Sequence, residues 1–155
     1  MAQHEGTAAG LTICVAVDGS ENSFRALEKG INLVSSRGRH DRLVLLMIQP
    51  RSTLLEALVD PFDMLHIPDR QLRLFAKKKL TESELRCKEE KVRFETKIVV
   101  TDVSEREELL GQIEALSPDL VVVGRRGLGA LAKLVMGSTS EFCLQNCPCP
   151  VYVAA

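Results

Sequence analysis

The chain has 155 residues, about one domain's worth, and 45% of them are hydrophobic, so it can bury a core without disulfides or metal. Twenty basic residues against twenty-one acidic ones give a formal net charge of -1. The chain as a whole therefore has no positive charge that would attract it to nucleic acid or to an anionic membrane. Residues 1–10 lack the apolar core of a signal peptide and no apolar run approaches membrane-spanning length, so we expect a cytoplasmic protein with a disordered tail at 1–10 and one domain at 11–155.

The first half of the chain alternates apolar strands with amphipathic helices. A strand is predicted at 11–17, and Asp18 belongs to the turn that leads into a helix. In that turn Ser20 can accept hydrogen bonds from backbone N–H groups of the first helical turn. A second apolar strand is predicted at 43–48. Residues 51–68 show no clean period and are predicted to form an irregular excursion.

The second half continues the alternation. A long helix begins near residue 69, and we interpret its lysine run at 77–79 as a solvated face. Strand and helix alternate throughout, which predicts one α/β domain with a mostly parallel sheet and helices on both faces. The remaining predicted elements are a strand at 94–100, a helix from 104, a strand at 120–123, a helix starting at 138 and a strand at 151–154.

The five cysteines are an odd number, which makes a disulfide framework a poor fit. Cys14 falls in an apolar strand and Cys87 on a helix, so reduced thiols are expected. A zinc site is the more specific alternative to free thiols, because three further cysteines lie close together. Their spacing across Pro148 is not that of a usual zinc site, however, and we therefore favour free thiols. These three are Cys143, Cys147 and Cys149.

The stretch 119–139 carries the strongest functional signal. A buried strand ends at Gly124, and the glycines that follow leave the backbone without side chains, so the loop can approach a bound group closely. A second helix then starts at Gly137-Ser138-Thr139. Its N-terminus combines backbone N–H groups, the positive end of the helix dipole and two hydroxyls, which together make an anion site suited to phosphate.

The spacing Gly124-x-x-Gly127, nine residues, then Gly137-Ser138 resembles the nucleotide-binding pattern of the ATP-binding universal stress proteins. The resemblance covers residues 13–153 and extends to the opening V-A-V-D-G-S and the closing C-P-V-Y-V. It implies a single Rossmann-like domain of the adenine-nucleotide alpha-hydrolase-like kind, with a five-stranded parallel sheet. It also implies that the first and fourth strands are neighbours, so that Asp18 would face the glycine loop.

The resemblance also implies roles for individual residues. The first-strand positions would line the nucleotide, with a carboxylate near the adenine or ribose, and the second-strand position would present its backbone to the adenine edge. The glycines and hydroxyls would hold the phosphates. We add Ser20 from the first turn and Arg126, whose guanidinium suits phosphate. The predicted nucleotide-binding residues are Ala16, Asp18, Ser20, Ile48, Val123, Gly124, Arg126, Gly127, Gly137, Ser138 and Thr139.

Asp18 has a second interpretation, since it could simply cap the helix that follows it. Other nucleotide motifs do not fit: G-R-R-G-L-G is not G-x-G-x-x-G, and no P-loop occurs. No second acid, His or Lys at fixed spacing suggests a general base. The expected function is therefore a nucleotide-dependent sensor or adaptor in stress response, with ATP or another adenine nucleotide, Mg²⁺ held through the phosphates, and an unknown protein partner.

Two other functions remain open from the sequence. One is a dimeric interaction module of the same fold that leaves the crevice empty, and the other is a slow ATP hydrolase. A homodimer is expected, because residues 151–155 form a β-prone strand without lysine, which the resemblance places at the sheet edge. Pro148 and Pro150 could instead protect that edge in a monomer.

Overall fold

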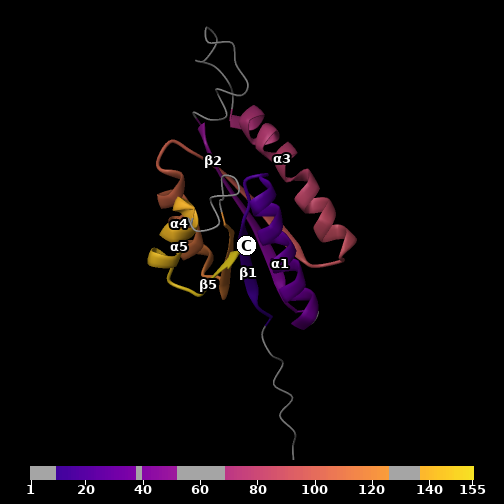
Figure 1. The fold of residues 1–155 in the computed structure, drawn as a ribbon. Helices are drawn as coiled ribbons and strands as arrows, with labels where there is room; N and C mark the ends of the chain where they lie inside the picture. The colour runs from indigo at the N-terminus through magenta and orange to yellow at the C-terminus, as the bar shows by residue number, and fades with distance from the viewer. Residues whose placement is uncertain (1–9, 38–39, 52–68, 126–136) are drawn as a thin grey trace, which may run out of the picture.

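The computed structural model describes residues 10–37, 40–51, 69–125 and 137–155. Within these ranges, five parallel strands form one sheet in the order β3-β2-β1-β4-β5, and helices cover both of its faces (Figure 1). The predicted α/β fold with a five-stranded parallel sheet is confirmed. The strands are β1 (Thr12–Ala16), β2 (Arg42–Pro50), β3 (Phe94–Thr101), β4 (Leu120–Gly124) and β5 (Val151–Ala154). The helices are α1 (Glu21–Arg37), α3 (Asp69–Glu89), α4 (Glu105–Leu116) and α5 (Ser138–Asn146).

The second strand runs two residues further than its apolar run predicts. Gln49 and Pro50 still pair with Val100 and Thr101 of β3, whereas the pairing of β1 with β2 stops at Leu46. A proline has no N–H to give to a ladder. Pro50 is tolerated because the side of β2 that faces β1 carries no ladder at that level.

The sheet separates two hydrophobic cores. Helices α1 and α3 cover one core, and α4 and α5 cover the other (Figure 1). Consecutive residues of β2 alternate between them: Leu45 is buried in the first core and Leu46 in the second. Because both faces are covered, the central strands β1, β2 and β4 carry nearly uninterrupted apolar sequences, whereas the edge strand β3 begins with alternating apolar and polar residues.

The lysine run on α3 is only partly the solvated face that the sequence predicts. Lys77 and Lys78 are exposed, but Lys79 is half-buried. Its Nζ donates a hydrogen bond to Gln49 Oε1 at 3.1 Å and lies 5.7 Å from the centre of the Phe75 ring. Residue 79 follows the buried Ala76 by one turn, so its aliphatic stem is drawn along the buried stripe of the helix.

The order in which the strands join the sheet reverses between β1 and β4. Strands β2 and β3 lie on one side of β1, and β4 and β5 lie on the other. The register pairs Ile13 with Leu120 and Val15 with Val122, so the adjacency that the resemblance implied is present. Open α/β sheets bind ligands in the crevice beyond the carboxyl ends of the strands at such a reversal.

Along the described ranges, none of the helices is both long enough and apolar enough to cross a membrane.

Candidate functional site

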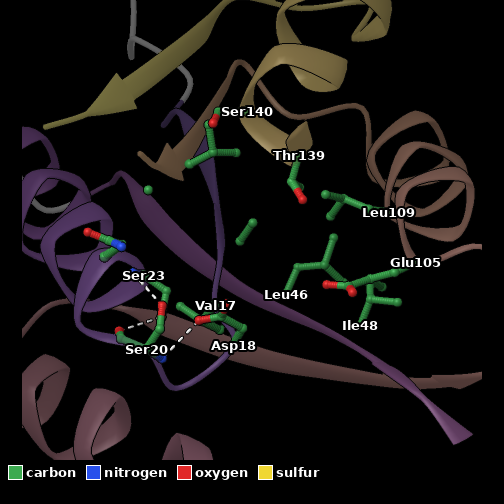
Figure 2. A pocket seen from close by; sticks show the side chains of 14 residues that line it. Val17, Asp18, Ser20, Ser23, Leu46, Ile48, Glu105, Leu109, Thr139 and Ser140 are labelled. Carbon is green, nitrogen blue, oxygen red and sulfur yellow. Dashed lines mark hydrogen bonds between the residues drawn. The ribbon is translucent and has the colours of Figure 1, made fainter. Parts of the chain in front are cut away.

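A crevice opens beyond the carboxyl ends of β1 and β4 (Figure 2). Its volume is about 70 Å³, below the roughly 300 to 1,000 Å³ that encloses a whole small-molecule ligand. A larger molecule would therefore bury one part here and extend out of the crevice. The described residues that line it are Ala16, Val17, Asp18, Ser20, Asn22, Ser23, Leu46, Ile48, Glu105, Leu109, Val123, Gly124, Thr139 and Ser140.

One wall of the crevice is apolar. Leu46 and Ile48 are alternate residues of β2, so both side chains point toward the α4 side of the sheet. Leu109, on the second turn of α4, closes the slot from above them (Figure 2). Ala16 and Val123 continue the wall on β1 and β4. An apolar slot of this kind suits the faces of an aromatic base.

The turn between β1 and α1 holds a carboxylate at the crevice. Asp18 Oδ1 accepts a hydrogen bond from Ser20 N at 2.8 Å, and Gly19 between them has a φ of +82°, which favours glycine. Ser20 Oγ in turn accepts from Ser23 N at 3.2 Å (Figure 2). The predicted cap at Ser20 is confirmed. Asp18 orders the turn ahead of the helix and lines the crevice, whereas the side-chain cap of α1 is Ser20.

The N-terminus of α5 faces the crevice from the other side. Gly137 is the buried N-cap residue, Ser138 is exposed, and the half-buried Thr139 points its side chain into the crevice (Figure 2). Ser140 is buried, and its Oγ donates to Gly137 O at 3.0 Å. The first-turn N–H groups of a helix have no acceptor inside the helix, so this end offers donors and a positive dipole to an anion.

Gly124 has a structural reason to be glycine that the sequence does not reveal. A Cβ atom placed there would lie 2.3 Å from Asn22 O and 2.6 Å from Asn22 C, both backbone atoms of α1. The end of β4 therefore touches the first turn of α1 directly. From the sequence, the backbone near Gly124 is expected to approach a bound group. On the side that faces α1, Gly124 instead approaches the protein's own backbone.

The crevice brings together most of the residues that the sequence singled out. Arg126 and Gly127 lie outside the described residues. Gly137 and Ser138 are at the same helix end but do not belong to the lining. The other seven predicted residues line the crevice: Ala16, Asp18, Ser20, Ile48, Val123, Gly124 and Thr139.

Sequence reasoning missed the contribution of α4. Glu105 and Leu109 are four residues apart, so they share one face of that helix, and this face meets the crevice. The crevice thus has a second acid, Glu105, in addition to Asp18. The sequence gave no reason to expect it there. The i, i+4 spacing was visible, but only the packing of α4 shows which cavity this face lines. The other lining residues missed were Val17, Asn22, Ser23, Leu46 and Ser140.

Four of the cysteines lie in or against the second core, which α4 and α5 cover. Cys14 and Cys143 are buried in the second core, and Cys147 and Cys149 pack against it half-buried. All five cysteines are free. Burial raises the pKa of Cys14, Cys87 and Cys143 to about 12, so these thiols stay protonated at neutral pH. Among the described residues, no group of three or more His, Cys, Asp or Glu side chains could hold a metal ion.

Comparison with protein families gives a match over almost the whole chain. The model of the universal stress protein family matches residues 11–155. The chain is also 33% identical over 156 residues to universal stress protein PHOS32 of Arabidopsis thaliana. That alignment takes in 91% of this chain and 63% of PHOS32, so the chain spans less than two thirds of this relative.

Solved structures agree with the fold. A universal stress protein family protein from Arabidopsis thaliana, solved with AMP bound, has a TM-score of 0.62 and 25% identity, with 92% of this chain and 90% of that one covered. A universal stress protein in complex with cAMP has a TM-score of 0.64 at 20% identity, covering 94% and 97%.

Proposed function

Because the chain belongs to the universal stress protein family, we propose that its crevice binds an adenine nucleotide, and ATP in particular. The observation that carries the proposal is the meeting of three unlike features at one reversal of the strand order. These are an apolar slot beside Ile48, a carboxylate at Asp18 and the N-terminus of α5 at Thr139. The base, the ribose and the phosphate chain of a nucleotide would be bound by these three features in turn.

The described residues suit such a ligand in chemistry, and the crevice encloses one part of it. The slot of about 70 Å³ holds only part of a nucleotide, so the base would insert between β2 and α4 while the phosphates remain outside it. The N–H groups of the first turn of α5 and the Thr139 hydroxyl then hold the phosphates. The two family structures solved with AMP and cAMP support an adenine ligand.

Magnesium fits only through the nucleotide. Mg²⁺ takes carboxylates together with substrate phosphates and keeps several waters. The described part of the chain contains no three-ligand group, but Asp18 and Glu105 both line the crevice. The ion would therefore be held mainly by phosphate oxygens, where it would offset their charge.

The direct test is to denature freshly purified protein and identify released nucleotide by mass spectrometry. Calorimetric titration of nucleotide-free protein with ATP, AMP and GTP then measures affinity and base preference. Saturable binding of ATP, with GTP clearly weaker, is the expected result. Binding of none of the three would favour the alternative of an interaction module with an empty crevice.

Turnover should be slow. The α5 terminus stabilises bound phosphate, but Asp18 is engaged with Ser20 N and Glu105 lies on the base-binding side near Ile48 (Figure 2). We expect hydrolysis far below the roughly 1 per second of an ordinary enzyme. Inorganic phosphate release from wild type, Asp18→Asn and Glu105→Gln would be measured under saturating ATP. A rate at or above that level, lost in either variant while ATP still binds, would identify a hydrolase.

A protein that holds ATP without rapid turnover can report nucleotide levels by its occupancy. We propose that this chain acts as a nucleotide-dependent sensor or adaptor in stress response. The bound phosphates would order the start of α5, and the exposed Leu144 on the same helix offers a surface for an unidentified protein partner.

We further propose that the protein forms a homodimer through β5. This strand lies at the edge of the sheet. Val121 N donates to Pro150 O and Arg125 N donates to Ala154 O, so alternate residues of β5 direct their backbone groups toward β4. Val151 and Val153 must then direct theirs outward. An edge with outward N–H and C=O groups and no charge is suited to pairing with a copy of itself.

Val153→Pro should convert the dimer to a monomer. The substitution removes an outward N–H and leaves the β4–β5 hydrogen bonds in place, so the fold should survive. Light scattering coupled to gel filtration at about 10 μM, a concentration well above a nanomolar Kd, is the measurement. Val153→Thr, which keeps the N–H and the β-branched shape, is the matched control and should remain dimeric. A monomeric wild type would refute the proposed dimer.

A further inference from the structure

A second hollow lies on the other face of the sheet, between the first half of α3 and the edge strand β3. Its volume is about 730 Å³, within the range of ligand-binding pockets, and it is open to solvent. We call it the α3–β3 groove. The lining residues that matter here are Arg70, Arg73, Leu74 and Lys77 of α3, with Ile98 of β3.

The groove is strongly cationic although the whole chain is not. Helix α3 contributes three basic residues to the lining, and the one acid there is Glu84, whose Oε1 already accepts a hydrogen bond from Thr96 Oγ1 at 3.2 Å. Within the described ranges none of these three cations forms an ion pair, unlike Arg86 further along α3, which pairs with three glutamates. Their charge is therefore available to an outside anion.

Arg73 is held in place by the protein itself. Its Nη1 donates to Ile98 O at 2.9 Å, which satisfies an outward carbonyl of the edge strand. A guanidinium has five N–H donors, so this one bond leaves donors for a carboxylate. The same bond occupies the outward carbonyl at this level of β3, which disfavours strand addition here and favours recognition of an incoming chain through side chains.

The spacing of the groove residues matches an extended peptide. Arg70 and Lys77 are seven residues apart on α3, which is about 10 Å along the helix axis. Three residues of a segment in the extended polyproline II conformation span about 9 Å, and its three residues per turn bring positions i and i+3 to one face. Between the two cations, Leu74 is 54% exposed, and it lines the groove together with the half-buried Ile98, so the lining includes an apolar surface.

We propose that the α3–β3 groove binds an extended acidic segment of a partner protein. Two carboxylates three residues apart contact Arg70 and Lys77, and an apolar side chain between them packs on Leu74. The charge pattern and the exposed leucine favour a peptide over nucleic acid. The described lining has no aromatic side chain on which a base could stack, and the net charge of the chain is -1.

The test uses the full chain and a labelled peptide, Glu-Glu-Leu-Leu-Glu-Glu, in fluorescence anisotropy at low salt. Saturable binding is expected, and Lys77→Glu should weaken it at least about tenfold, since it turns an attraction into a repulsion. Lys78→Glu is the matched control, because Lys78 is also exposed on α3 but is not part of the lining. It should change affinity less than about twofold, the effect of a screened distant charge.

Two further probes separate the alternatives. The peptide Leu-Glu-Glu-Glu-Glu-Leu has the same composition and charge without the central leucines, and it should bind more weakly. Leu74→Ser should weaken binding of the first peptide and remove its advantage over the second. Equal effects of Lys77→Glu and Lys78→Glu, no saturation up to about 1 mM, or tighter binding of a single-stranded oligonucleotide of equal charge would each overturn the proposal.

ATP titration of the Lys77→Glu variant distinguishes this site from the crevice. The groove lies across the sheet from the nucleotide crevice, so ATP affinity should be unchanged in that variant. A parallel loss of peptide and ATP binding would mean that the substitution damages the fold, and Arg70→Glu at the other end of the groove then replaces it as the test.

Discussion

Thr139→Asp should weaken ATP binding about 100-fold, or about 2.7 kcal/mol, without destabilising the protein. The Thr139 side chain points into the crevice at the N-terminus of α5, so an aspartate there would place a carboxylate against the phosphates (Figure 2). An acid in the first turn of a helix is favourable for the helix itself, by about 0.3 to 1 kcal/mol. Loss of affinity could therefore not be attributed to unfolding.

Calorimetry measures the affinity for ATP, and a thermal melt of the same samples measures stability. Thr139→Ser retains the hydroxyl and should bind within about threefold of wild type, as expected when no hydrogen bond is lost. Thr81→Asp makes the same chemical change at an exposed position of α3 outside the crevice and should leave affinity unchanged. If Thr139→Asp binds ATP as tightly as wild type, α5 does not hold the phosphates.

Gly124→Ala should destabilise the fold by about 3 kcal/mol, as expected for overpacking against atoms that cannot move aside. The added Cβ would lie 2.3 Å from Asn22 O, and the backbone of α1 would have to shift away from β4. For a domain of this size the melting temperature should fall by about 6 to 12 °C. Chemical denaturation with wild type in parallel gives the free energy of unfolding.

Gly111→Ala is the matched comparison, with the opposite sign expected. Gly111 is exposed in the interior of α4, and a Cβ there meets nothing within 4 Å. Alanine should therefore stabilise the helix by about 0.5 to 1 kcal/mol. If both variants were equally stable, the contact of β4 with α1 would not be what requires glycine at residue 124.

Thr139 and Gly124 contribute to the crevice in different ways. The Thr139 variant tests the proposed ligand, and the Gly124 variant tests the contact that forms the crevice. Glycine substitutions near β4 are therefore a poor probe of nucleotide binding. A loss of ATP affinity in Gly124→Ala would follow from displacement of α1 and would say little about phosphate.

The sequence by itself determined the elements and the class of fold. Uninterrupted apolar runs marked strands buried on both faces, and helical spacing marked the faces of the helices, because these patterns depend only on local periodicity. The glycine and hydroxyl spacing from Gly124 to Ser138 indicated the family, which the match over residues 11–155 shows. The resemblance to that family also implied roles for Asp18, Ile48 and Thr139, all of which line the crevice.

Only the tertiary structure decided what those elements meet. The pairing of β1 with β4, the entry of Glu105 into the crevice and the contact of Gly124 with Asn22 all join residues far apart in the chain. The same holds for the bond from Arg73 to Ile98 that orders the α3–β3 groove. A periodic pattern states that a face is buried, but not against which partner, because the choice of partner depends on how whole elements pack around the sheet.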